Sequence, residues 1–369
     1  MTVDPKRFAD RVAPWLTPEG PDSDVVFSCR VRLARNVEGY PFVSKLSGER
    51  ALELCERLQP DLCALDLGKD VGNEVEWVLL PNADSVLRLL LRERHLVSRD
   101  LAPVSKDRPV QPGRAVAFTR EETLSIMVNE EDHLRLQTMV GGFDLDRAWE
   151  RAREVDRQLE QRVSFAHSER YGYLTCCPTN VGTGMRASVM LHLPALGLVR
   201  SELEKVFTAA QRTGLAVRGL YGEGSRAVGD FYQISNQVTL GRPEDVLIEE
   251  LRDLVPAIVR FERDVRRMLL DEQRSALVDR VSRSYGMLRT ARAMPTDGAL
   301  AHLSNLRLGA CLGIWKEVPL EDLARMRVQI QKGHLQALSA GQETSSILDA
   351  SARDRLRAAY LRKALAEHN

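Results

Sequence analysis

The sequence predicts an α+β fold, with an antiparallel sheet flanked by helices and an all-α C-terminal domain. Four segments in the first 242 residues alternate polar and apolar side chains, as half-buried strands do. Such strands favour an antiparallel sheet with helices on one side and a functional groove on the other. From about residue 243 the apolar spacing becomes helical. We therefore expect a terminal segment at 1–23, a mixed α and β domain at 24–242 and a helical domain at 243–369.

The first alternating segment is DVVFSCRVRLARN, at residues 24–36. One face should be apolar and the other polar. The apolar set is Phe27, Cys29, Val31 and Leu33, and the polar set is Ser28, Arg30 and Arg32. After it, ERALELCERL and NADSVLRLLLRERHL have helical spacing, and VEWVLL between them is typical of a short strand.

Three later segments alternate in the same way. TLSIMVNEEDHLRLQ reads as one strand, which would separate Glu131 from Arg135 by about 13 Å at roughly 3.3 Å per residue. In MRASVMLHL the apolar face is Ala187, Val189, Leu191 and Leu193, and the polar face is Arg186, Ser188 and His192. In YQISNQVTL the polar face is Gln233, Ser235, Gln237 and Thr239.

A helical stripe of apolar residues opens the C-terminal region. It consists of Leu247, Leu251, Leu254, Ile258, Phe261, Val265 and Met268. Pro256 falls inside this stripe. Because proline lacks a backbone donor and clashes with the preceding turn, we expect it to kink or split the helix.

The composition argues against several classes of protein. The 369 residues have a formal net charge of zero, which disfavours broad electrostatic binding to nucleic acid. The six cysteines include no C-x-x-C pair, so zinc-ribbon spacing is absent and free thiols in a reducing cytoplasm are expected. The N-terminus lacks the apolar core of a signal peptide, and no apolar run reaches the length of a membrane span.

Arginines gather on the polar strand faces. Arg30 and Arg32 share one face, and Arg135, Arg186 and Arg218 lie on or beside others. An arginine fork can bind phosphate oxygens in a bidentate manner, so these residues suit a polyphosphate. Surface strands also carry arginine as solubilising charge, and that interpretation stays open.

The common nucleotide-binding motifs do not explain such a site. The sequence has no G-x-x-x-x-G-K-[ST] loop and no H-R-D or D-F-G set. GTGMRA and GEGSRA match G-x-G-x-x-A, but neither is followed by a strand with a convincing acidic end. A dinucleotide-binding fold is therefore disfavoured.

Two carboxylates and one thiol are candidates for chemistry. Glu131 lies on the arginine face and Glu223 between two glycines, so the pair could clamp a guanidinium and accept its proton. Cys177 begins a Pro-Thr-Asn turn, where nearby arginines would favour its thiolate. The alternatives are a solvated loop acid for Glu223, an ion pair with Arg135 for Glu131 and an inert core thiol for Cys177. Cys176 fits an inert thiol better.

Four motifs in order resemble those of the phosphagen (guanidino) kinase family: SCRVRLARNVEGYPF, VNEEDHLRLQ, CPTNVGTGMRAS and VRGLYGEGS. Their spacing and the helical extension are similar to the bacterial protein-arginine kinases of that family. The resemblance implies a phosphagen-kinase-like catalytic domain at 24–242 that transfers a phosphoryl group from ATP–Mg²⁺ to a guanidinium nitrogen. It implies that phosphates and water mainly hold the Mg²⁺, with no protein metal ligand.

The resemblance implies three sets of site residues. The catalytic set is Glu131, Asp132, Cys177 and Glu223, of which the glutamates hold and deprotonate the guanidinium and the thiolate polarises it. The ATP-binding set is Ser28, Cys29, Arg30, Val31, Arg32, His95, Arg135, Arg186, Ala187, Ser188, Val189, Met190, Arg218, Gly219, Leu220, Tyr221, Gly222 and Glu223, with His95 stacking on adenine. The allosteric set, in RDRLRA, is Arg353, Asp354, Arg357 and Ala358, which would bind phosphoarginine.

The resemblance also implies an acceptor and partners. Creatine and arginine kinases carry a small helical domain that closes over a small substrate, whereas about two dozen residues precede the first arginine motif here. An open acceptor site suits arginine side chains of proteins, marked for degradation in a bacterial stress response. A zinc-finger activator protein, a Clp-type ATPase or protease and a homodimer are implied as well. The alternatives are a kinase for a small guanidino compound and a non-catalytic reader of phosphoarginine.

Overall fold

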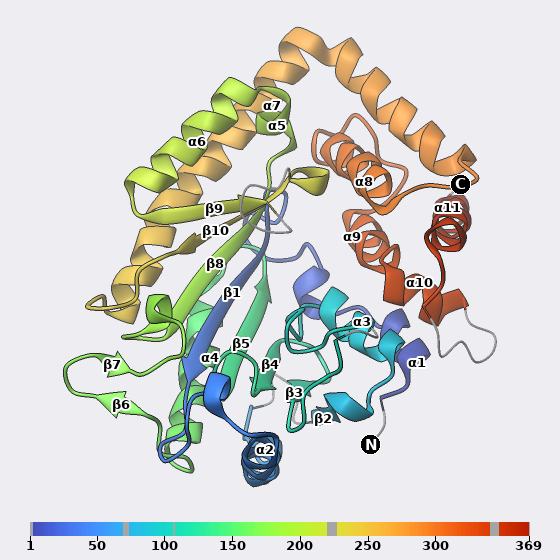
Figure 1. Ribbon diagram of the computed structural model, residues 1–369. Coiled ribbons are helices and arrows are strands. Elements are labelled where there is room, and N and C mark those ends of the chain that lie inside the picture. The colour runs from blue at the N-terminus through green and yellow to red at the C-terminus, as the bar shows by residue number, and fades with distance from the viewer. Residues whose placement is uncertain (1–2, 69–73, 106–107, 220–226, 340–346, 369) are drawn as a thin grey trace.

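The computed structural model describes residues 3–68, 74–105, 108–219, 227–339 and 347–368 (Figure 1). Within these residues, one antiparallel sheet of eight strands has the order β2-β3-β4-β5-β1-β8-β10-β9. In that order the strands are Val75–Leu79, Ala115–Thr119, Leu124–Val128, Leu134–Gly141, Val26–Arg35, Met185–His192, Phe231–Asn236 and Leu215–Gly219. A small hairpin, His167–Ser168 (β6) and Gly172–Tyr173 (β7), projects from one end. The predicted antiparallel sheet is confirmed.

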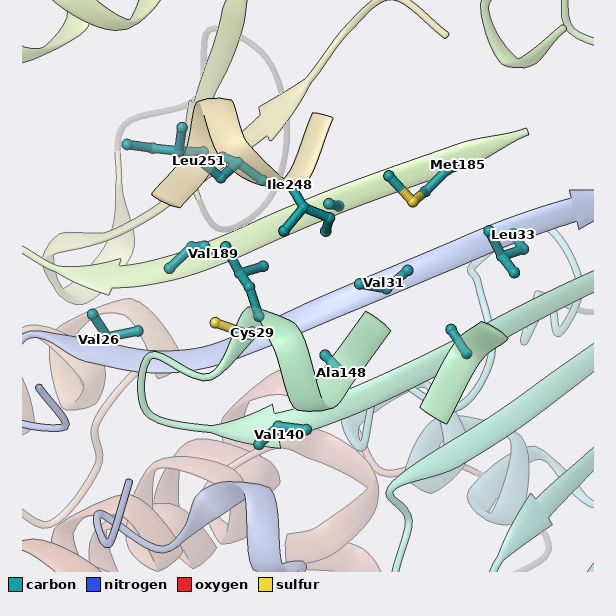
Figure 2. Close-up of a cluster of buried hydrophobic side chains, with 14 of the residues drawn as sticks. Val26, Cys29, Val31, Leu33, Val140, Ala148, Met185, Val189, Ile248 and Leu251 are labelled. Atoms are coloured by element: carbon teal, nitrogen blue, oxygen red, sulfur yellow. The ribbon is translucent and has the colours of Figure 1, made fainter. Parts of the chain in front are cut away.

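Helices cover one face of this sheet. They are α2 (Gly48–Cys63), α4 (Leu145–Glu160), α6 (Arg200–Arg212) and the first half of α7 (Glu244–Thr290). Figure 2 shows how Cys29, Val31 and Leu33 of β1 meet Val189 of β8, Ala148 of α4 and Ile248 and Leu251 of α7. Burying each such side chain contributes about 1.5–3 kcal/mol, so the alternation of β1 forces its arginines to the other face.

A bulge at the start of β1 turns Phe27 away from this core. The pairing of β1 with β8 shifts register between Val26 and Ser28, so Val26 joins the helix-covered core instead. The Phe27 ring lies 6.2 Å from that of Trp15 and 5.3 Å from that of Phe231, between centroids, in a separate cluster. The prediction that Phe27 shares a face with Cys29, Val31 and Leu33 is wrong, because an irregular residue in a strand reverses the side-chain alternation.

The segment around Glu131 is a hairpin and not the single strand that we expected. β4 ends at Val128, Asn129 adopts a φ of 55° and β5 begins at Leu134. Asn tolerates positive φ, which is why the chain turns here. Glu131 therefore lies in the turn, and its Oε2 accepts a hydrogen bond from Arg135 Nη2 at 3.0 Å. The predicted separation of these two residues is wrong, and the alternative of an ion pair is confirmed.

The strand that contains Gln233 ends earlier than predicted. The Asn236 side chain accepts from the Ala187 backbone amide at 2.8 Å and donates to the Met185 carbonyl at 3.0 Å. These bonds use β8 groups that a longer β10 would pair with. Gln237 and Thr239 therefore lie beyond the strand and not on its polar face.

α7 runs without interruption past Pro256, where we expected a kink or split. Its non-helical residue is Gln273, with φ −133° and ψ 30°. Leu251, Val255 and Val259 around the proline are buried against the sheet, and this packing holds the helical path. The boundary predicted at residue 243 stays a prediction, but the change in surroundings along α7 lies near Gln273.

The remaining helices stand opposite the polar face of the sheet (Figure 1). They are α1 (Pro5–Asp10), α3 (Ser85–Glu93), α8 (Thr296–Cys311), α9 (Leu320–Gln329), α10 (Lys332–Ser339) and α11 (Ala350–Ala366), while the short α5 (Pro194–Leu198) precedes α6. Ala324 and Val328 of α9 pack against Phe27 and Met139 on that face. Among the described helices, none is both long and apolar enough to cross a membrane.

Candidate active site

Five arginines lie on the polar face of neighbouring strands. Arg32 of β1 pairs directly with Arg186 of β8, and Arg30 lies two residues before it. Arg135 follows on β5, and Arg218 of β9 pairs with Gln233 of β10. The predicted convergence of these five side chains on one face follows from the strand order, which places β1 between β5 and β8.

The first of these arginines sit in an electrostatically costly position. Burial, and then the charges of Arg186 and Arg135, lower the pKa of the Arg30 guanidinium to about 10. Burial and the same kind of repulsion lower the pKa of Arg32. Arg30 Nη2 donates to Gln233 Oε1 at 2.9 Å, a neutral partner that does not offset the charge. Clustered, half-desolvated cations of this kind favour a polyanionic ligand.

A cavity of about 920 Å³ opens onto this face. Arg30, Arg32 and Arg135 line its sheet side, and helices α3, α9, α10 and α11, with the loop after α3, contribute further cations. These are Arg92, Arg99, Arg327, Lys332, Arg353 and Arg357, against the acids Glu93, Asp297 and Asp354. Such an excess of positive charge in a concave site attracts phosphates.

His95 lines the same cavity just after α3. Its φ is 60°, and its ring meets that of Trp15 edge-on at 5.8 Å between centroids. Burial, with the charges of Arg30 and Arg327, lowers the pKa of His95 to about 3, so the imidazole is neutral. A neutral ring at the wall of the cavity suits stacking on a nucleobase.

Other predicted nucleotide residues fall into three groups. Ser28, Ser188 and Met190 line a narrow recess together with Arg30 and His95. Cys29, Val31, Ala187 and Val189 point into the helix-covered core, so any contact of their side chains with a ligand in the cavity is blocked. Gly219 ends β9, whereas Leu220, Tyr221, Gly222 and Glu223 lie outside the described residues.

Glu131, the candidate for accepting the proton of a guanidinium, lies beside the arginine face. Arg135 is held from both sides, by Glu131 at 3.0 Å and by Glu130 at 2.9 Å. Burial raises the pKa of Glu131, against the attraction of Arg135 and with the repulsion of Glu130 and Asp132. A carboxylate whose pKa is raised is a better proton acceptor than an ordinary one.

Asp132 links the turn that contains Glu131 to the loop that contains Cys176 and Cys177. Its Oδ1 accepts from Asn36 Nδ2 at 2.7 Å and from the Cys176 backbone amide at 2.7 Å. The side chain is buried, so this carboxylate positions its neighbours Glu131 and Cys177 relative to each other. The family resemblance implies a catalytic role for Asp132, whereas its contacts with Asn36 and Cys176 leave no mark in the sequence.

The two adjacent cysteines have different surroundings. Cys177 is half-buried, precedes a short helix at Pro178–Asn180, and places its Sγ 3.0 Å from Thr179 Oγ1. Thr239 fixes this loop from the other side, since its Oγ1 donates to the carbonyl oxygens of Thr179 and Val181. Burial, and then Asp132, raise the pKa of the Cys176 thiol.

The RDRLRA motif lies in α11 and reaches the same large cavity. Asp354 and Arg357 form an ion pair with each other at 2.6 Å. Arg357 is only 1% exposed and also donates to the carbonyl oxygens of Ile330 at 2.9 Å and Met294 at 2.8 Å. Ala358 is buried in the core of the C-terminal helices, whereas Arg353 is half-buried and lines the cavity.

Comparison with known proteins identifies the family of this fold and site. The C-terminal catalytic domain model of the ATP:guanido phosphotransferases matches residues 64–265, and the model of the protein-arginine kinase McsB C-terminal domain matches residues 274–369. These matches lie on either side of the break at Gln273.

Curated relatives match over nearly the full length. The protein-arginine kinase of Halalkalibacterium halodurans is 40% identical over 361 residues, which cover 98% of this chain and 97% of that protein. The protein-arginine kinase of Halothermothrix orenii is 41% identical over 336 residues, 91% of this chain and 93% of that protein.

Solved structures agree with this assignment. The duplicated taurocyamine kinase from Schistosoma mansoni with bound transition state analog components aligns with a TM-score of 0.58 and 30% identity, over 70% of this chain and 35% of that chain. Lombricine kinase aligns with a TM-score of 0.56 and 26% identity, over 69% and 71% respectively. The chain therefore belongs to the protein-arginine kinases of the ATP:guanido phosphotransferase family.

Proposed function

We propose that the arginine face of this kinase binds the phosphates of ATP and that the end marked by Glu131 and Cys177 receives an arginine side chain of a protein substrate. The observation that carries this proposal is the set of like charges on one sheet face, of which Arg30, Arg32 and Arg135 line one large cavity. Phosphoryl transfer of this kind depends on alignment and on charge stabilisation more than on covalent chemistry.

Each group has a definite part in the transfer. Arg32, Arg186 and Arg135 would neutralise the charge that develops on the transferred phosphoryl group. Glu131 would take the proton from the attacking guanidinium nitrogen, since a neutral nitrogen has the lone pair that attack requires. Cys177, as a thiolate, would orient the same guanidinium without forming a covalent bond. His95 would stack on the adenine. Glu223 is the second carboxylate of this proposal and lies outside the described residues.

Magnesium fits the site only through the nucleotide. Within the described residues, no group of three or more His, Cys, Asp or Glu side chains could hold a metal ion, and arginines form the sheet side of the cavity. Phosphate oxygens and water would therefore hold the Mg²⁺, which would offset the charge of the phosphates when bound.

Further features of the proposal rest on family membership. We expect Arg353, Asp354, Arg357 and Ala358 to form a regulatory phosphoarginine site, since the first three line the shared cavity and Ala358 packs directly behind them. We also expect a cytoplasmic homodimer that marks stress-damaged proteins for a Clp-type ATPase or protease, with a zinc-finger protein as activator.

Incubation with ATP and Mg²⁺ tests the proposal directly. The wild-type chain should form phosphoarginine on an unfolded protein such as casein and leave free arginine unmodified, as read by mass spectrometry under conditions that preserve the acid-labile P–N bond. The Arg32→Ala variant should form it about 10²–10³-fold more slowly. Phosphorylation of free arginine alone would instead support a small-guanidino kinase, and ATP-independent binding of phosphoarginine without turnover would support a reader protein.

A further inference from the structure

One arginine beside the nucleotide face comes from the C-terminal region. Arg327 lies near the end of α9, beyond the residues that match the phosphotransferase domain model. It is only 8% exposed. Its side chain lines the large cavity together with Arg30 and His95, and it also lines the narrow recess that contains Ser28 and Ser188.

Apolar packing fixes Arg327 in this position. Its neighbours on α9, Ala324 and Val328, are buried in the cluster that contains Phe27 and Phe231. The guanidinium carbon of Arg327 lies 3.9 Å from the centroid of the Phe231 ring and 4.7 Å from that of Phe27. Stacking engages the planar faces of a guanidinium, whereas its N–H donors point outward from the edge.

The charge of Arg327 adds to that of the sheet. It is one of the charges, after burial and Arg30, that lower the pKa of His95, and all three side chains line the same narrow recess. Arg30 and Arg327 thus concentrate positive charge at one wall of the cavity, which favours an anionic ligand there. The kinase domain alone, matched at 64–265, does not include this charge.

We propose that Arg327 is a nucleotide-binding residue that contacts the α-phosphate of the bound nucleotide from the C-terminal region. The inference rests on the proposed function, in which His95 stacks on adenine and Arg30 binds phosphate. The α-phosphate is the phosphate nearest the ribose and adenine, and therefore meets a cation placed beside both residues. The C-terminal helices then complete the nucleotide site as well as carrying the RDRLRA motif.

Nucleotide affinities test this contact. Arg327→Met keeps an unbranched stem on the phenylalanine rings and removes the charge. We expect it to weaken ATP, ADP and AMP by about tenfold or more in calorimetric titrations, because all three carry the α-phosphate. Adenosine, which lacks it, should bind both proteins equally. The control is Arg325→Met, an exposed arginine of the same helix, which should match wild type.

The possible outcomes distinguish a failure of the Arg327 contact from a failure of the proposed function. Thermal unfolding first establishes that Arg327→Met is folded; if it is not, Arg327→Lys decides, with an expected loss of a few-fold because lysine lacks the bidentate fork. A folded variant that binds AMP as tightly as wild type overturns the contact. Equal losses for AMP and adenosine also overturn it, since they assign Arg327 to the shape of the pocket. A wild-type chain that binds no nucleotide contradicts the proposed function itself.

Discussion

Arginines on the sheet and arginine in helix α11 have opposite surroundings. Arg30 and Arg32 project from β1, whose backbone is paired on both sides, and their side chains line the large cavity. Arg357 lines the same cavity, yet its guanidinium donates to the carbonyl oxygens of Ile330 and Met294 and to the Asp354 carboxylate. Arginine side chains on the sheet therefore face a cavity that can hold a ligand, whereas Arg357 of α11 binds backbone carbonyl oxygens of the protein itself.

The difference follows from where backbone carbonyls remain without a partner. A central strand satisfies its backbone groups in the sheet, so an arginine on it has few internal acceptors to reach. A helix leaves its last carbonyls without partners, and Ile330 is the C-cap residue of α9. Changes on the sheet face should therefore reduce turnover, whereas a change at Arg357 should reduce stability.

The largest expected effect is at the carboxylate beside the arginine face. Glu131→Gln should lower kcat by about 10²–10⁴-fold, because the amide keeps the shape but cannot accept the guanidinium proton. Steady-state kinetics with protein substrate measure this. Glu130→Gln, which loses the other ion pair to Arg135, is the matched control and should have a much smaller effect. Comparable losses in both variants would show that the ion pairs matter and not the base.

The pH dependence sharpens the same comparison. Glu131 must be ionised to accept a proton, and its pKa is raised by burial. The rate at subsaturating substrate should therefore fall as pH decreases through this raised pKa and recover above it. A pH–rate profile of the wild type should show this acidic limb, and an unaltered limb in the Glu131→Gln variant would contradict the assignment.

The next effect is at the centre of the sheet face. Arg32→Ala should lower kcat/KM by about 10²–10³-fold, as the loss of one donor to a developing charge does. Its melting temperature should stay the same or rise, because the change removes a buried cation from beside Arg30, Arg135 and Arg186. The exposed Arg120, which pairs with Glu74, provides the control. A destabilised and still active Arg32→Ala variant would break the contrast with Arg357.

In the helical region the expected loss is of stability. Arg357→Ala should cost about 1–3 kcal/mol for each buried group left unsatisfied, because two carbonyl oxygens lose their donor. Thermal or urea unfolding measures the loss, and Arg355→Ala, exposed on the same helix, is the control. An unchanged unfolding midpoint together with a lost response to phosphoarginine would place Arg357 with the ligand-binding arginines instead.

Much of the sheet was predictable because burial imposes a period of two. The faces of β1 from Cys29 onward and of β8 follow directly from it. The predictions for Phe27 and Glu131 fail for related reasons. A bulge at Phe27 and a turn before Glu131 each change the side-chain direction, and neither changes the polar and apolar pattern of the sequence. Alternation therefore identifies a face and does not identify where the strand stops.

The site was predictable only where the chemistry lies in a local motif. The strand arginines, Asp132 and Cys177 stand in recognisable segments, whereas Arg327 and Thr239 act through contacts with distant parts of the chain. Arg327 joins the cavity because α9 packs on Phe27 and Phe231, residues about 100 to 300 positions away in sequence. Spacing within one segment carries no information on such contacts.

The smallest expected effect separates the two adjacent thiols. Cys177→Ser should lower turnover by about tenfold, or about 1.4 kcal/mol in the barrier, because serine is a poorer anion beside a guanidinium. Cys176→Ser should stay near wild type, since its thiol has a raised pKa and it is the backbone amide of Cys176 that bonds Asp132. Alkylation with iodoacetamide should inactivate the wild type and Cys176→Ser alike, and ATP with substrate should slow it. If Cys176→Ser instead resists alkylation and loses turnover, Cys176 is the reactive thiol. The arginine of the protein substrate would then be expected beside Asp132, whose carboxylate bonds the Cys176 backbone amide.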